Sequence, residues 1–136
     1  MKKIFILCII ILTLGCSSDK NDRNQSDSIV GKWYYKEIIV NADLVIPYDD
    51  HEDCGKDYIQ FGADGSFRII DVWDCEEDPM GEGTYTLEGN ILTFFDGPES
   101  LQTILLEKTP HALKYNYEFD YDNDGTIDSV TETYFR

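Results

Sequence analysis

The chain has 136 residues, of which 11 are lysine or arginine and 27 are aspartate or glutamate, giving a formal net charge of −16 at pH 7. A protein this acidic repels nucleic acids and anionic membrane surfaces, so we expect no nucleic-acid partner. The same charge favours solubility, bound cations or a basic protein partner.

The N-terminus has the pattern of an export signal. Lys2 and Lys3 precede an apolar run over residues 4–14, which is too short to span a bilayer as a mature helix, and Gly15 follows it. We therefore predict that residues 1–15 are a signal peptide. Its removal takes away two lysines and no acidic residue, so the net charge becomes 9 minus 27, or −18.

The stretch TLGC, which ends at Cys16, resembles a bacterial lipobox, in which the signal is cut before a cysteine that then receives lipid. The resemblance implies a cell-envelope protein that is anchored to the outer membrane through lipid on Cys16. The alternative is ordinary secretion with a free thiol, which is unusual in an oxidising compartment. Residues 16–28 carry no apolar side chain after the cysteine, which predicts a flexible tether before a domain over 29–136.

Two cysteines remain in the expected domain, Cys54 and Cys75, and we predict that they form a disulfide. A metal site built from them would need further ligands, and His51 is near enough in sequence to suggest one. No CxxC or HxxxH spacing supports that alternative.

The domain shows the alternation of β-strands. In KYNYEFD, residues 114–120, aromatic side chains at every second position define one apolar face. Short turns rich in glycine, asparagine and aspartate separate such segments, which favours neighbouring antiparallel strands. Closing the sheet removes its free edges, so we predict an all-β fold, an eight-stranded antiparallel up-and-down meander barrel. The predicted strands cover residues 29–40, 57–61, 66–73, 82–87, 91–95, 101–107, 112–119 and 127–135.

Two registers are open for the hairpin that joins the second and third predicted strands. If Asp64 and Gly65 form a two-residue turn, residues whose numbers sum to 129 face each other, and Cys54 lies directly opposite Cys75. If Gly65 instead forms a bulge after a type I turn at residues 63–64, the register moves by one residue. The cysteines then meet in the loops beyond the strands.

The domain begins with Gly31 and Trp33, the Gly-x-Trp pattern that opens lipocalin barrels. Residues 30–136 resemble the small lipocalin-like domains of Gram-negative bacterial lipoproteins. The resemblance implies an antiparallel barrel behind a lipid anchor, with Trp33 packed at the closed end. We match no lipocalin signature that carries an arginine near the C-terminus, where this chain has Arg136. The resemblance rests on IVGKWYY (29–35), CGKDYIQFGADGSFRIIDVWDC (54–75), GTYTLEGNILTFF (83–95) and LLEKTPHALKYNYEF (105–119).

A barrel of eight strands either fills with its own side chains or holds one small ligand. The aromatic residues of the domain fit both alternatives, because they can pack as a core or line a cavity for an apolar guest. The candidate lining residues are Trp33, Tyr35, Tyr85, Tyr115, Tyr117 and Phe119.

The segment DYDNDGTIDSVT can be aligned with the twelve-residue calcium loop of helical calcium sensors. Gly125 occupies the sharp turn, but Thr131 stands where that loop has its bidentate glutamate. Strands flank the segment in place of helices, so a bound calcium ion would be weak and structural. The alternative is a solvated turn. The candidate ligands are Asp120, Asp122, Asp124, Thr126 and Asp128.

No nucleophile elbow, zinc-protease motif, phosphate loop or dinucleotide fingerprint is present, so we predict that the protein is not an enzyme. The first functional hypothesis is non-catalytic binding of a small apolar or amphipathic ligand by a monomeric, lipid-anchored barrel. The alternative is a filled acidic barrel that docks a basic protein or serves as a structural envelope component.

Overall fold

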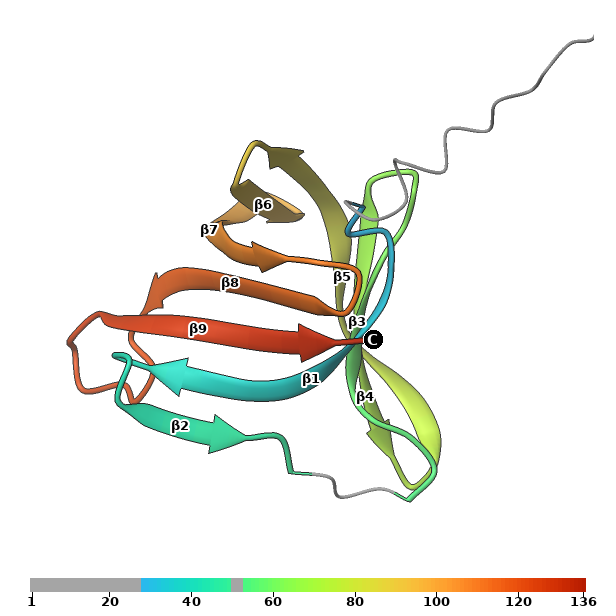
Figure 1. The fold of residues 1–136 in the computed structure, drawn as a ribbon, viewed down its shortest axis with the longest axis horizontal. Helices are drawn as coiled ribbons and strands as arrows, with labels where there is room; N and C mark the ends of the chain where they lie inside the picture. Colours follow the sequence, from blue (N-terminus) through green and yellow to red (C-terminus); the bar gives the residue numbers. More distant parts are fainter. Residues whose placement is uncertain (1–27, 50–52) are drawn as a thin grey trace, which may run out of the picture.

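The computed structural model describes residues 28–49 and 53–136, which form nine β-strands (Figure 1). Within these ranges no helix is long and apolar enough to cross a membrane. The predicted signal peptide, Cys16, nearly all of the tether and His51 lie outside the described residues. The strands are β1 (Gly31–Val40), β2 (Leu44–Pro47), β3 (Tyr58–Phe61), β4 (Ser66–Trp73), β5 (Glu76–Glu88), β6 (Ile91–Asp96), β7 (Glu99–Lys108), β8 (Ala112–Phe119) and β9 (Asp128–Phe135).

The sheet closes into an eight-stranded antiparallel barrel, as predicted. Each strand from β3 to β8 pairs with the one that follows it in the chain, β3 pairs with the first half of β1, and β9 pairs with β1 from Tyr34 to Val40. The ninth strand, β2, pairs with the second half of β1 on the side that β3 leaves free. The all-β prediction is therefore confirmed, with one short additional strand that the sequence did not indicate.

Strand β5 begins at Glu76, six residues before the predicted range. The reason is a two-residue turn at Asp74 and Cys75, which both have positive φ angles, 53° and 65°, so that Trp73 pairs with Glu76. Such turns usually contain Asn-Gly or Asp-Gly, and the pair Asp-Cys does not carry that signal. The strand also contains Pro79, which is tolerated because the β4–β5 register shifts there.

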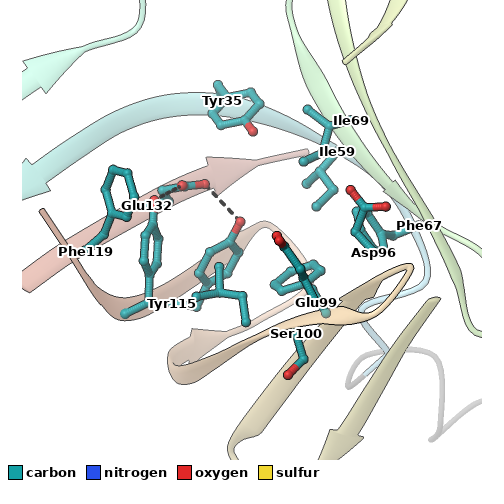
Figure 2. Close-up of a pocket in the computed structure, with 13 residues that line it drawn as sticks. Tyr35, Ile59, Phe67, Ile69, Asp96, Glu99, Ser100, Tyr115, Phe119 and Glu132 are labelled. Carbon is teal, nitrogen blue, oxygen red and sulfur yellow. Dashed lines mark hydrogen bonds between the residues drawn. The ribbon is translucent and has the colours of Figure 1, made fainter. Parts of the chain in front are cut away.

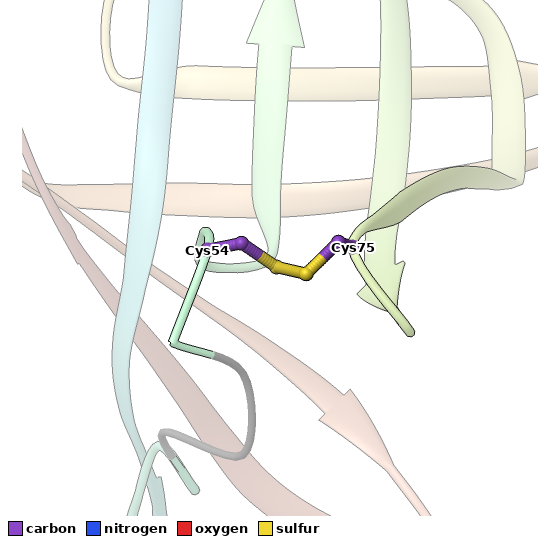
Figure 3. The surroundings of a disulfide bond; sticks show 2 residues. All are labelled: Cys54 and Cys75. Atoms are coloured by element: carbon purple, nitrogen blue, oxygen red, sulfur yellow. A yellow bond between two sulfur atoms is a disulfide. The ribbon is translucent and has the colours of Figure 1, made fainter.

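The structure decides between the two registers of the β3–β4 hairpin. Phe61 pairs with Phe67, and the Gly65 amide donates to the Gly62 carbonyl at 3.2 Å, as in a type I turn followed by a bulge. Gly65 has a φ of 83°, which glycine adopts without steric cost. The cysteines therefore meet beyond the strands, with Cys54 before β3 and Cys75 in the β4–β5 turn (Figure 3). The predicted disulfide is confirmed, and its Cα atoms are 5.6 Å apart.

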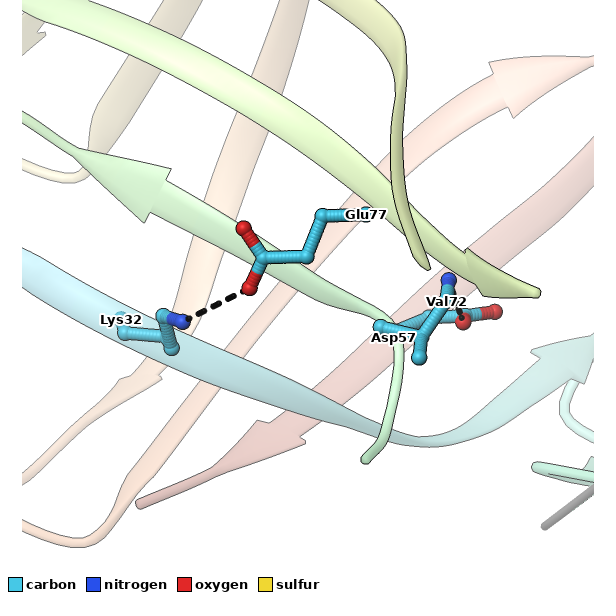
Figure 4. A network of polar contacts seen from close by, with 4 residues as sticks. All are labelled: Lys32, Asp57, Val72 and Glu77. Atoms are coloured by element: carbon cyan, nitrogen blue, oxygen red, sulfur yellow. Dashed lines mark hydrogen bonds and ion pairs between the residues drawn. The ribbon is translucent and has the colours of Figure 1, made fainter. Parts of the chain in front are cut away.

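Two polar contacts hold the long β4–β5 hairpin against the rest of the barrel (Figure 4). Lys32 of β1 forms an ion pair with Glu77 of β5, with Nζ and Oε1 separated by 3.6 Å. The Asp57 carboxylate accepts a hydrogen bond of 2.8 Å from the amide of Val72 on β4. The disulfide and these contacts fix the end of the hairpin that lies farthest from the Gly65 turn.

The fully buried indole of Trp33 lies under Arg136, whose guanidinium is 3.9 Å from the ring centroid. The indole nitrogen donates to the Ile29 carbonyl at 2.7 Å. Gly31 leaves room for this arrangement, because a Cβ atom there would lie 3.2 Å from the arginine Nη1. The guanidinium also donates to three backbone carbonyls, those of Ser28, Val30 and Pro110. Arg136 thus connects the C-terminal end of the barrel to Trp33 and to the segment that precedes β1.

We predict that Arg136→Ala lowers the free energy of unfolding by about 1–3 kcal/mol, because it removes charge-assisted hydrogen bonds and the cation–π contact on Trp33. Arg68→Ala is the matched control, since Arg68 is exposed and forms only a 3.9 Å ion pair with Glu82 among described residues. Urea unfolding followed by tryptophan fluorescence measures both. Equal stabilities of the two variants would contradict the prediction.

We also expect the disulfide to stabilise the domain by about 3 kcal/mol, because it closes a loop of roughly 20 residues in the unfolded chain. Replacing Cys54 and Cys75 together with serine removes this stabilisation. Urea unfolding with and without dithiothreitol checks it: the reductant should destabilise the native protein and leave the double variant unchanged.

Candidate functional site

The barrel holds a cavity of about 430 Å³ (Figure 2). Its walls come mainly from the inward faces of β3, β4, β6, β7, β8 and β9, and the partly exposed side chains of Leu101 and Phe119 lie at its opening. Six of the lining residues are aromatic, three are aliphatic and three are acidic. The lining comprises Tyr35, Ile59, Phe67, Ile69, Phe94, Asp96, Glu99, Ser100, Leu101, Tyr115, Tyr117, Phe119 and Glu132.

Four of the six aromatic residues that the sequence suggested line this cavity, namely Tyr35, Tyr115, Tyr117 and Phe119. Trp33 and Tyr85 do not. Trp33 packs at the part of the core covered by Arg136. Tyr85 packs edge-to-face on Phe61, with ring centroids 4.9 Å apart, and donates its hydroxyl to the Gly62 carbonyl at 3.0 Å. Both side chains therefore have structural roles.

The inward position of Glu132 is the feature that sequence reasoning missed. On β9 the side chains of Val130, Glu132 and Tyr134 alternate with Thr131 and Thr133, and the first three share the inner face. Strand alternation places a carboxylate inside the barrel between a buried valine and a buried tyrosine. The alternating pattern VTETY indicates a strand with two distinct faces. It does not indicate which face lies inside the barrel, because one face carries polar threonines and the other carries a glutamate.

Three tyrosine hydroxyls donate hydrogen bonds to the Glu132 carboxylate. Tyr117 donates to Oε1 at 2.6 Å, Tyr115 donates to Oε2 at 2.9 Å, and Tyr134 donates to the same Oε2. The hydroxyl oxygens of Tyr115 and Tyr134 also lie 2.6 Å apart, but each phenol carries one proton, so when both donate to Oε2 neither donates to the other. Tyr35 completes the group, because its ring lies 4.5 Å from that of Tyr134. The neutral donors compensate part of the cost of placing a carboxylate in the barrel.

Burial raises the pKa of Tyr35, Tyr115, Tyr117 and Tyr134, and the nearby Glu132 carboxylate raises the pKa of each further. Both effects disfavour the phenolate, the first through desolvation and the second through charge repulsion. The four phenols therefore remain neutral hydrogen-bond donors at physiological pH.

Asp96 and Glu99 add two further carboxylates to the cavity lining. They are paired residues at the ends of β6 and β7, on either side of the turn at Gly97 and Pro98. Figure 2 shows both across the cavity from Glu132. The predicted strands leave residues 96–100 as a turn, but the direction of its acidic side chains depends on which face of the sheet lies inside the barrel.

The acidic loop between β8 and β9 brings together three of the five predicted calcium ligands. Carboxylate oxygens of Asp120, Asp122 and Asp124 lie within 4.8 Å of one another. Asp128 is directed elsewhere, because its carboxylate accepts hydrogen bonds from the Asn41 side chain at 2.6 Å and the Tyr121 amide at 3.0 Å. Thr126 contributes an amide that donates to Asp124 at 2.7 Å. Calcium binding by this loop stays a prediction.

Comparison with protein families identifies a lipocalin-like domain over residues 29–115. Among solved structures, the chain is similar to an uncharacterized protein from Bacteroides eggerthii DSM 20697, with a TM-score of 0.60, 14% identity, and coverage of 80% of this chain and 99% of that chain. It is also similar to a dog lipocalin allergen, with a TM-score of 0.47, 16% identity, and coverage of 80% and 74%. A comparison with curated proteins finds no match. The first of these structures shows a shared fold, which by itself assigns no activity.

The tyrosine cluster makes a specific prediction for alkaline pH. In the unfolded chain tyrosines ionise near pH 10, whereas the four cluster phenols have a higher pKa in the fold. Above about pH 10 the unfolded state therefore loses protons that the folded state keeps, so the free energy of unfolding falls as the pH rises. Absorbance at 295 nm should show a group of tyrosines that ionises only together with the loss of β-sheet circular dichroism.

Glu132→Gln should lower the pKa of these phenols, because it removes the negative charge but not the burial. Glu118→Gln, on the outer face of β8, is the control and should leave the titration unchanged. An unchanged titration of the Glu132→Gln variant would contradict the account of the cluster.

Proposed function

Because the chain belongs to the family of lipocalin-like domains, we propose that it binds a small apolar or amphipathic ligand inside the barrel, without catalysing a reaction. The observation that carries this proposal is the cavity of about 430 Å³. Pockets for small ligands commonly measure about 300–1,000 Å³ and are mostly apolar with a few polar groups. This cavity has that size and that lining.

Binding would be driven by removal of apolar surface from water, at roughly 25 cal/mol per Å². The side chains that would provide this surface are aromatic rings of Phe67, Phe94 and Phe119 and the aliphatic chains of Ile59 and Ile69. Polar groups at one wall would orient the ligand. No covalent step is needed for this function.

The cavity also favours ligand binding over the alternative of a filled acidic barrel. That alternative depends on an interior occupied by the protein's own side chains.

We further propose that the barrel is attached to the outer membrane of a Gram-negative cell through lipid on Cys16. The support is the order of Lys2, Lys3, the apolar run and the TLGC motif in the sequence. A tether over residues 16–28 would hold the barrel near the membrane surface while leaving its cavity open to solvent.

The test is a titration with N-phenyl-1-naphthylamine, a neutral apolar probe whose fluorescence increases in an apolar site. We expect saturable binding with a dissociation constant on the order of micromolar. Leu101→Trp should weaken binding about tenfold or more, because Leu101 lines the cavity near its opening and a larger side chain occupies probe space. Leu106→Trp is the matched control, since Leu106 is exposed on the same strand and does not line the cavity.

Equal binding by the two tryptophan variants would place the probe outside the barrel. Absence of saturable binding by the native protein would count against a carrier function for this cavity.

A further inference from the structure

We propose that the ligand of this cavity is an amphipathic cation, whose protonated amine pairs with Glu132 and whose apolar body packs against the aromatic walls. This inference rests on the proposed function, because it names the ligand class of the same cavity. It is based on the charge of the lining, on the partners of Glu132 and on the arrangement of the rings.

The first observation is that Glu132 has no cationic partner. In residues 28–49 and 53–136 its carboxylate receives hydrogen bonds from Tyr115, Tyr117 and Tyr134 but forms no ion pair with a lysine, arginine or histidine. Neutral phenols lower the cost of desolvating the carboxylate, but they leave its negative charge in place. An amine cation entering the cavity would supply the missing opposite charge.

The second observation is the sign of the remaining polar lining. Asp96 and Glu99 are acidic, Ser100 is neutral, and no lysine, arginine or histidine is among the described residues that line the cavity. A fatty acid or another anionic amphiphile would meet three carboxylates and no positive charge. The lining therefore selects against anions by repulsion as well as for cations by attraction.

The third observation is the aromatic surface next to the carboxylate. The rings of Tyr115 and Tyr117 are 6.4 Å apart, and the Phe94 ring is 5.7 Å from that of Tyr115. The faces of aromatic rings attract cations, most strongly where water is partly excluded. Because burial and Glu132 keep the phenols protonated, these rings stay neutral and their hydroxyls stay donors.

A metal ion does not fit this cavity as well as an organic cation does. Calcium and magnesium need several oxygen ligands that converge on one point. Among the described residues, the acidic side chains whose ligand atoms converge in this way are Asp120, Asp122 and Asp124, in the β8–β9 loop. The cavity carboxylates lie on opposite walls with apolar side chains between them, which suits a molecule with one charged end and an apolar body (Figure 2).

The experiment compares three probes that share a ten-carbon chain: decylamine, decanol and decanoate. Each displaces N-phenyl-1-naphthylamine from the native protein at pH 7, where decylamine is protonated and decanoate is ionised. We expect decylamine to bind at least tenfold more tightly than decanol, and decanoate to bind more weakly than decanol. Raising the salt concentration should reduce the preference for decylamine, because part of it is electrostatic.

Glu132→Gln should reduce the ratio of decylamine to decanol affinity about tenfold. The ratio cancels any general change in the cavity, since both probes use the same chain. Glu118→Gln removes the same charge from the outer face of β8 and should keep the native ratio. If Glu132→Gln does not fold, the double variant Asp96→Asn and Glu99→Gln tests the other acidic wall, where we expect a smaller decrease of the same ratio.

The outcomes separate the two proposals. If the naphthylamine probe binds but decylamine shows no preference over decanol, or decanoate binds best, the cationic ligand is wrong and the carrier function stands. If the probe and all three decyl compounds fail to bind, both proposals fail. The inference would also be overturned if the native protein prefers decylamine and the Glu132→Gln variant keeps that preference, because the amine would then not pair with Glu132.

Discussion

The pairing of β9 with β1 is the constraint on which the rest of the molecule depends. It closes the sheet, and closure gives every strand one inner and one outer face. Once β9 is fixed in register with β1, Glu132 and Tyr134 must face inward, and the register of β8 with β9 places Tyr115 opposite Glu132. The polar group of the cavity is therefore a consequence of how the barrel closes.

The interior is divided between two kinds of packing. Around Trp33, aromatic and aliphatic side chains fill the barrel, and Arg136 covers the indole while tying the two ends of the described chain together through backbone carbonyls. Four residues earlier on β9, at Glu132, the packing gives way to a cavity with a hydrogen-bonded carboxylate. A well-packed end supplies stability, and this allows the other end to keep open space and a partly buried charge.

The fold was largely predictable because its signals are local. Alternation in segments such as 114–120 and short polar turns identify strands and their order without knowledge of tertiary contacts. The start of β5 was not predictable, because Asp74 and Cys75 adopt a turn conformation that their residue types rarely favour. Strand β2 is short and mostly exposed, so the sequence LVIP carried little pattern to detect it.

The site was only partly predictable because its partners are distant in sequence. The aromatic residues of β8 were identified from their alternation. Glu132, however, receives two of its three hydrogen bonds from β8, and Tyr85 contacts Phe61 and Gly62 instead of lining the cavity. The role of Arg136 likewise depends on carbonyls more than 100 residues away in sequence. These contacts form when the sheet closes into a barrel, and local sequence patterns do not predict which strands closure brings together.

The position of the disulfide has a consequence for the order in which the molecule folds. Cys54 and Cys75 are separated by 21 residues and lie around a single hairpin, whereas the β1–β9 pairing joins residues about 90 to 100 positions apart. Contacts of short sequence separation form with a smaller loss of chain entropy, so oxidation of the β3–β4 unit can precede closure. The unit that this bond closes contains Ile59 on β3 and Phe67 on β4, so two residues of the cavity lining belong to the part of the chain with the shortest-range covalent constraint.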